Sequence, residues 1–251
     1  VRGFKSKVKN TKKNLNHLFT KFNKDLNLDN FISSKLFLTL EKANNDTYLK
    51  IFDAHITKSQ ARPGSSSTLE NELKIVLNHE DYNFSSGIKS YERLNEGKKN
   101  DRYQYVLPYY SFDKILSNNF LNGSLNFTSS GTNDLNNTNQ LKSNIINDLS
   151  YNSYSFITKS GISNDLKTNI KNLNSIGKNY SNYKSSPQIE VSSIFSLNSS
   201  YPLFKNNENS KSFLTPKASL RFNPGDMKDN SSSKNKINVG NIFSLNRLGL
   251  S

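Results

Sequence analysis

The sequence predicts an all-β fold, namely part of an antiparallel, up-and-down transmembrane β-barrel in which roughly ten to twelve strands form an open sheet. Three observations support this prediction. Segments of alternating apolar and polar residues recur along the chain, with polar turns between them. Mean hydropathy is -0.72 and only 33% of the residues are hydrophobic, which leaves a compact domain of this length short of core residues. Aromatic residues nevertheless make up 11% of the chain, unlike typical disordered sequences.

The clearest alternation runs from Phe213 to Pro224. Because successive side chains of a strand point to opposite faces, this segment would have one apolar wall and one wet, cationic wall. A tilted strand of roughly 9 to 11 residues crosses the hydrocarbon layer of a membrane. A half-buried strand of a soluble sandwich fits this single segment as well, so the other segments must decide. The apolar set is Leu214, Pro216, Ala218, Leu220 and Phe222, and the polar set is Thr215, Lys217, Ser219, Arg221 and Asn223.

The first part of the chain predicts a hairpin. Residues 1–16 are basic and weakly patterned, as in a frayed arm, and residues 18–26 are a first candidate strand. Residues 31–42 alternate more clearly and end in the turn-forming residues 43–46. Residues 47–56 are then the expected partner strand.

Two further strands are expected around a short turn. Residues 60–67 are rich in Gly, Pro and Ser and predict a loop. Residues 69–77 alternate between leucine or isoleucine and charged residues, and residues 82–91 return after the turn 78–81. Residues 94–101 are too charged for lipid and predict an aqueous loop.

An aromatic stripe marks the next segment, residues 102–112. Tyr103, Tyr105, Leu107 and Tyr109 share one face of a strand. Amphipathic rings gather where lipid meets water, so we expect this face at a membrane interface. The alternative is a soluble core, which would have to satisfy several phenol hydroxyls at once.

The remainder of the chain predicts weaker strands joined by polar loops. Apolar residues at helical spacing in residues 42–52 and 135–146 are outweighed by Asn-rich flanks and missing caps, so no helix is predicted. Pro216 cannot donate to a two-sided ladder and predicts a bulge or local edge. The expected strands are residues 121–127, 141–151, 156–166, 168–176, 188–197 and 237–251, and the expected loops are residues 129–139, 206–212 and 226–236.

The net charge of +14 indicates an anionic partner, such as a membrane surface, a lipid or a nucleic acid. Abundant Lys, Asn, Ile, Phe and Tyr are also what an AT-rich coding sequence gives, and this accounts for much of the charge. The absence of cysteine excludes disulfides and thiolate metal sites from this chain. The chain opens at Val1 and ends within a strand pattern, so we expect a longer parent protein on both sides.

No catalytic or cofactor site is predicted. The histidines His17, His55 and His79 have no second ligand at metal spacing, and His79-Glu80-Asp81 is best explained as a solvated turn. Gly-rich phosphate loops, G-x-S-x-G and H-E-x-x-H are absent from the sequence. We therefore expect neither an enzyme nor a bound cofactor or metal.

Two blocks of residues form distinctive motifs. One is Tyr91-Glu92-Arg93-Leu94 with residues 102–108, RYQYVLP. The other combines residues 214–218, LTPKA, with residues 223–226, NPGD, and residues 242–248, IFSLNRL. Together the two blocks resemble the LptD (OstA/Imp) family of outer-membrane lipopolysaccharide-assembly proteins. The family-like positions are Tyr91, Tyr105, Leu107, Pro108, Pro216, Pro224, Gly225, Asp226 and Arg247.

The resemblance implies a place and a task. Residues 1–251 would be part of the C-terminal β-barrel domain, with both barrel ends and a periplasmic domain missing. The partners would be lipopolysaccharide, a plug lipoprotein of the LptE type, a periplasmic bridge protein of the LptA type and the outer membrane, with no nucleic acid. Lipopolysaccharide would pass to the outer leaflet without any covalent step.

Within that resemblance, Lys217 and Arg221 face the right way to meet an anionic lipid head in the lumen. The alternative is that they form ion pairs with carboxylates on neighbouring strands, such as Glu190. Two other classes of protein also remain open. Another outer-membrane barrel, such as a porin or receptor, would share the alternation without the two blocks. A secreted β-sandwich or adhesin would have no lipid-facing band.

Overall fold

The computed structural model describes residues 2–7, 14–52, 60–95, 100–180, 183–207 and 210–224. Gly225, Asp226, Arg247, His55 and the expected strand at residues 237–251 lie outside these ranges. The described elements are β1 (Arg2–Lys7), β2 (Asn14–Asp25), β3 (Ser33–Ala43), α1 (Tyr48–Ile51), β4 (Thr68–Asn78), β5 (Tyr82–Arg93), a 3-10 turn (Asn100–Arg102), β6 (Tyr103–Ser117), β7 (Gly123–Asn136), β8 (Gln140–Ser153), β9 (Phe156–Ile157), β10 (Ser163–Lys178), β11 (Gln188–Ser200), β12 (Leu203–Asn207), β13 (Ser210–Leu214) and β14 (Lys217–Phe222).

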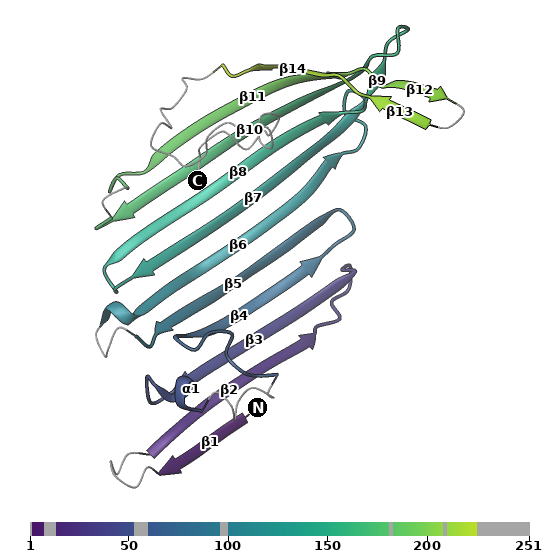
Figure 1. Cartoon of the computed structure of the whole chain (residues 1–251). Coiled ribbons are helices and arrows are strands. Elements are labelled where there is room, and N and C mark those ends of the chain that lie inside the picture. The colour runs from purple at the N-terminus through teal and green to yellow at the C-terminus, as the bar shows by residue number, and fades with distance from the viewer. Residues whose placement is uncertain are drawn as a thin grey trace. The chain divides into compact units, whose positions relative to one another are not determined.

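The predicted fold class is confirmed: the chain is all-β and forms an antiparallel, up-and-down sheet that does not close (Figure 1). The strand order is β1-β2-β3-β4-β5-β6-β7-β8-β10-β11-β14, and β9 pairs with β10. Strands β12 and β13 form a separate two-stranded sheet. Among the described residues, no helix is long and apolar enough to span a membrane.

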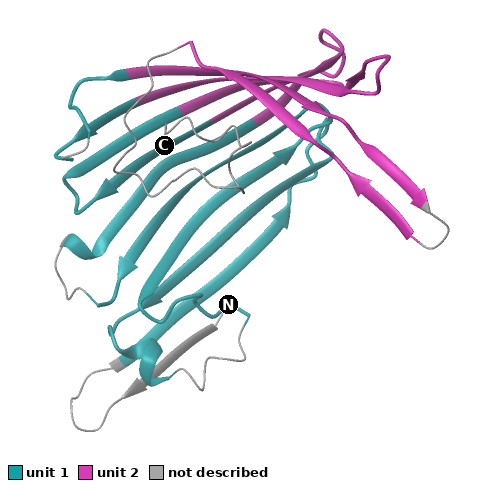
Figure 2. Ribbon diagram, turned by 45° about the horizontal axis from the view of Figure 1, so that its top comes forward, with its two compact units in different colours: residues 1–112, 130–145, 175–188 teal, residues 113–129, 146–174, 189–251 magenta. Residues whose placement is uncertain are grey.

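The chain divides into two compact units (Figure 2). The first contains residues 1–112, 130–145 and 175–188, and the second contains residues 113–129, 146–174 and 189–251.

In the first unit, the register of β2 to β5 places apolar side chains in rows. Phe22 lies opposite Leu38, Leu38 opposite Leu73, and Leu73 opposite Ile88. Phe22 is 48% exposed and Leu73 is 42% exposed, so this face is not covered. We call this face the apolar wall; it comprises Leu18, Phe22, Leu36, Leu38, Leu40, Leu73, Ile75, Leu77, Phe84 and Ile88, with Thr20, Lys24, Lys42 and Ser86 among them.

The opposite face of the same strands is polar. Lys21 lies opposite Thr39, Thr39 opposite Glu72, and Glu72 opposite Lys89. Since the side-chain period of a strand is two, these residues alternate with the apolar rows and point the other way. We call this face the polar wall; it comprises Lys21, Asn23, Asp25, Lys35, Thr39, Glu41, Glu70, Glu72, Lys74, Lys89 and Tyr91, with Phe37 and Val76 among them.

In the second unit, the register of β11 and β14 repeats this separation. Leu220 lies opposite Leu197, and Phe222 lies opposite Phe195. Arg221 lies opposite Ser196, on the other face. The predicted interruption at Pro216 is confirmed, because β13 ends at Leu214 and β14 begins only at Lys217.

Several predicted elements are wrong. Residues 1–16 are not only a frayed arm, because they contain β1 and the start of β2. The predicted strands 156–166 and 168–176 are instead the short β9 and one long strand, β10. The predicted loop at residues 129–139 lies largely in β7, and that at residues 206–212 lies largely in the β12–β13 hairpin. Polar composition misled the prediction, since pairing with neighbouring strands overrides weak local propensity.

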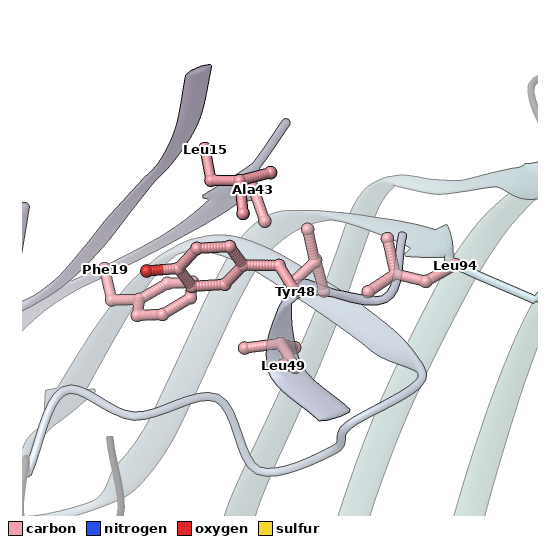
Figure 3. Packing of buried hydrophobic residues seen from close by; sticks show 7 residues of the cluster. Leu15, Phe19, Ala43, Tyr48, Leu49 and Leu94 are labelled. Atoms are coloured by element: carbon pink, nitrogen blue, oxygen red, sulfur yellow. The ribbon is translucent and has the colours of Figure 1, made fainter. Parts of the chain in front are cut away.

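The expected hairpin partner at residues 47–56 is also wrong. Its described part is the short helix α1, and β3 pairs instead with β2 and β4. Tyr48 and Leu49 of this helix are buried in a cluster with Leu15, Phe19, Ala43, Leu69 and Leu94 (Figure 3). Burial of the apolar side chains of Tyr48 and Leu49 therefore holds the segment as a helical turn rather than as a strand.

Candidate functional site

A charged network lies on the polar wall of the first unit. Lys89 Nζ is 3.1 Å from Glu72 Oε1 and 3.4 Å from Glu70 Oε1. The Tyr109 hydroxyl donates a hydrogen bond to Glu72, and Lys89 Nζ lies 5.4 Å from the centre of the Tyr109 ring. Three adjacent strands, β4, β5 and β6, thus present two carboxylates, an ammonium group and a phenol to the same side.

The predicted aromatic stripe includes Tyr109, whose face we expected at a membrane interface. In the structure its hydroxyl contacts Glu72 on the polar wall. Tyr103 and Tyr105 do stack, with ring centroids 6.3 Å apart and an interplanar angle of 16°.

Gly87 makes room for the Tyr109 phenol. A Cβ atom at Gly87 would lie 2.5 Å from the Leu73 carbonyl oxygen and 2.7 Å from the Tyr109 hydroxyl oxygen. Both separations are too short for real contacts, so a side chain at this position must displace the ring or the strand. The absence of a Cβ at Gly87 is therefore what lets Tyr109 cross β5 and reach Glu72.

We expect Gly87→Ala to lower the free energy of unfolding by about 1–3 kcal/mol, the usual cost of overpacking. The matched control is Gly64→Ala, because a Cβ atom at Gly64 would meet no atom within 4 Å. Urea unfolding followed by far-UV circular dichroism measures both changes. Equal stability of the two variants would contradict this account of Gly87.

The β3–β4 connection covers one end of the polar wall. His17 Nδ1 lies 2.6 Å from the Tyr48 hydroxyl in a hydrogen bond, and the His17 ring stacks on Phe19 at 4.4 Å between centroids. Lys21 Nζ donates a hydrogen bond to the Arg62 carbonyl oxygen at 3.3 Å. His17, Phe19 and Lys21 alternate along β2 on the same side, so α1 and Arg62 lie over the polar wall.

Arg102 links the β3–β4 connection to the end of β5; we call this contact the Arg102 clamp. Its Nη2 atom donates to Asp46 Oδ1 at 3.1 Å and forms an ion pair with Glu92. The Arg102 side chain is only 5% exposed. Burial alone would lower the pKa of Arg102, but the hydrogen bond to Asp46 and the charge of Glu92 raise it above its ordinary value. The guanidinium therefore stays charged, and it ties the β3–β4 connection to β5.

In the second unit, Lys217 and Arg221 lie on the same face of β14. They are opposite Ser200 and Ser196 of β11, respectively. Ser219, between them, donates a hydrogen bond to Asn198 at 2.8 Å, and Asn198 donates to Asp165 at 2.8 Å. This face is therefore the polar side of the second unit, as the alternation predicted.

The alternative ion pair with Glu190 is not supported by the register. Glu190 lies in the same strand as Ser196 but six positions earlier, which corresponds to about 20 Å along a strand. That separation exceeds the reach of the Arg221 side chain. It is larger still for Lys217, which pairs with Ser200.

The other predicted positions fall in three places. Tyr91 lies in β5 opposite Glu70, on the polar wall. Tyr105, Leu107 and Pro108 lie in β6, and the Leu107–Pro108 peptide bond is cis. Pro216 and Pro224 flank β14, outside the strand itself. His79 lies in a turn, where its Nδ1 atom accepts a hydrogen bond from the Asp81 amide, as expected.

Sequence reasoning missed two side-chain clusters, the Glu72–Lys89–Tyr109 network and the Arg102 clamp. The charged period of residues 70–74 was visible in the sequence, but its partners on β5 and β6 depend on register. Asp46 lies 56 positions before Arg102, and no local pattern connects it to Glu92 and Arg102. Within the described ranges, no group of three or more His, Cys, Asp or Glu side chains is placed to hold a metal ion.

Comparison with known proteins gives no family for this chain. No protein-family model matches the sequence, and no curated protein matches it.

Proposed function

We propose that the chain is part of an outer-membrane β-barrel, with its apolar wall toward lipid and its polar wall toward the lumen. The separation of the two walls along the printed registers of β2 to β5 is the observation that carries this proposal. A β-sandwich buries its apolar face against a second sheet. Exposure of Phe22, Leu73 and Ile88 on the apolar wall favours lipid as the covering medium.

Strand length supports the same placement. Strands β2 to β8 contain 11 to 15 residues each. A membrane-spanning strand needs roughly 9 to 11 residues, so each of these strands is long enough to cross the hydrocarbon layer and to continue into water.

We further propose that this barrel moves lipopolysaccharide to the outer leaflet, as the resemblance of its two motif blocks implies. The lipid's anionic head would travel along the polar wall while its acyl chains leave sideways into the membrane. The chain would perform no covalent step. A plug lipoprotein of the LptE type would fill the lumen, and a bridge protein of the LptA type would deliver the lipid through a periplasmic domain.

The charges on the polar faces fit a path along which an anionic lipid moves better than they fit a site that holds the lipid in place. In the first unit the Lys89 ammonium is neutralised by Glu70 and Glu72. In the second unit no described carboxylate forms an ion pair with Lys217, which is exposed. An exposed cation of this kind can hold a phosphate briefly and release it, since surface ion pairs contribute little stability.

The proposal is tested by depleting the parent protein in its own cells and measuring lipopolysaccharide at the surface. We expect surface lipopolysaccharide to fall while newly made lipid accumulates inside. If depletion changes only solute uptake, the protein is a porin or receptor instead. If the protein folds and stays monomeric in plain buffer, a soluble sandwich or adhesin is the correct class.

The double variant Lys217→Leu and Arg221→Leu addresses the lumen-facing residues. We expect it to insert normally, because lumen-facing positions need not be charged for stability, and to restore surface lipopolysaccharide more slowly than the unmodified protein. Heat-modifiable gel mobility measures insertion separately from transport. Restoration at the unmodified rate would exclude a role for these two cations.

A further inference from the structure

The β12–β13 hairpin of the second unit is an apolar element without a core. Phe204 lies opposite Phe213, with ring centroids 5.3 Å apart, and Leu203 lies opposite Leu214 on the other face. Phe204 is 60% exposed and Phe213 is 74% exposed. The hairpin forms its own two-stranded sheet, and an isolated hairpin is marginally stable in water. Its apolar faces therefore need a covering medium.

Cations accompany these apolar side chains. Lys205 and Lys211 project from the two strands of the hairpin and are exposed. No described carboxylate forms an ion pair with either lysine. In sequence, residues 203–214 contain two lysines against one glutamate, so the hairpin as a whole is cationic.

A second exposed apolar turn belongs to the same surface. Phe156 and Ile157 of β9 are both exposed, and Lys159 follows in the turn to β10. This turn adjoins the start of the hairpin, because a Cβ atom at Gly161 would lie 3.3 Å from Tyr201 Cε2. The turn after β9 and the start of the hairpin are thus neighbours within the second unit, and we call their exposed apolar and cationic side chains the hairpin surface.

We propose that this surface lies on an anionic bilayer, with the Phe204–Phe213 pair at the boundary between headgroups and acyl chains and the lysines on lipid phosphates. Aromatic side chains flanked by lysine are the composition that binds such interfaces. Lys211 shares one face of the hairpin with the Phe204–Phe213 pair, so a bilayer interface can take up the two rings and meet this lysine at once. The proposal rests on the membrane placement above and adds to it a lipid-binding site made by residues other than the lumen-facing Lys217 and Arg221.

The chain contains no tryptophan, so one introduced tryptophan reports the position of the hairpin by fluorescence. The full chain would be folded into phosphatidylcholine vesicles containing a minor fraction of phosphatidylglycerol, as the Phe213→Trp and Phe204→Trp variants. Lipids brominated at shallow or deep acyl positions quench a tryptophan according to its depth. We expect a blue-shifted emission and stronger quenching by shallow bromine in both variants.

The lipid preference is read by placing bromine on only one of the two lipids. We expect brominated phosphatidylglycerol to quench the Phe213→Trp variant more than its mole fraction predicts. Adding Lys205→Gln or Lys211→Gln should lower this preference roughly fivefold each, the equivalent of about 1 kcal/mol for one cation at an anionic surface. A preference that is absent, or that is unchanged by both substitutions, would overturn the assignment of anionic lipid.

The Leu73→Trp variant separates this inference from the proposed function, because Leu73 lies in the middle row of the apolar wall. If bromine quenches the Leu73→Trp variant but neither hairpin variant, the barrel is in the membrane and the hairpin inference is wrong. If bromine quenches none of the three, both proposals fail. Stronger quenching of the hairpin variants by deep bromine would place the hairpin in the hydrocarbon layer and would also overturn its interfacial position.

Discussion

Replacing Leu38 by Arg is expected to lower the yield of stable insertion into bilayers. Leu38 lies between Phe22 and Leu73 in the middle row of the apolar wall. An arginine at the midplane of the lipid face of a barrel costs about 2–4 kcal/mol. That cost is a large part of the stability of an ordinary domain, which is about 5–15 kcal/mol. Folding yield into vesicles, read as the fraction with heat-modifiable gel mobility, measures the loss.

The matched control is Thr39→Arg, which introduces the same residue at the next position. Thr39 lies between Lys21 and Glu72 on the polar wall, where an added guanidinium remains in a polar environment beside a carboxylate. We expect near-normal insertion of this variant. If both variants insert equally well, or if Thr39→Arg is the more damaging, the assignment of the two walls to lipid and lumen is wrong.

Replacing Arg102 by Ala is expected to release the β3–β4 connection from the polar wall. The change leaves Asp46 and Glu92 without the cation that neutralises them. Removing one partner of a fully buried ion pair costs about 3–5 kcal/mol. The cost here should be smaller, because the side chain of Asp46 is itself 31% exposed. Hydrogen exchange of the amides in residues 45–52 should accelerate, while exchange in β4 and β5 changes little.

Arg102→Lys tests whether charge alone is sufficient. A lysine retains the positive charge, but its shorter side chain lacks the terminal nitrogen, Nη2, that contacts both carboxylates. We expect exchange rates between those of the unmodified chain and of Arg102→Ala. Unchanged exchange in Arg102→Ala would show that the apolar cluster around Tyr48 holds the connection by itself.

The sequence predicted the strands that alternate strongly and missed those whose polar composition hid them. Residues 69–77 and 82–91 match β4 and β5 closely, because leucine and isoleucine alternate there with charged residues. The Ser, Gly and Asn side chains of residues 129–134 carry no such signal, and their strand, β7, depends on its neighbours for hydrogen bonds. Apolar residues at helical spacing around Tyr48 indicated the helix α1. The prediction gave more weight to the Asn-rich flanks and the missing caps, and so placed a strand there.

The sequence predicted the relative positions of site residues only where those residues lie in the same strand. Lys217 and Arg221 were correctly placed on one face and Leu220 on the other, since period two is a property of one segment. The joining of Glu72, Lys89 and Tyr109 requires the registers of three strands, and the joining of Arg102 to Asp46 requires the path of a long connection. Neither is encoded in local periodicity.

The strict register of β2 to β5 also determines which changes in chain length this protein can accept. One residue inserted at the centre of β3 would turn every later side chain of that strand to the opposite face, unless a bulge absorbed it. Thr39 and Glu41 would then exchange environments with Leu38 and Leu40. Two inserted residues would restore the original faces. Insertions of one residue should therefore be confined to the connections, such as residues 79–81 between β4 and β5, whereas inside the strands only even-numbered insertions preserve the original faces.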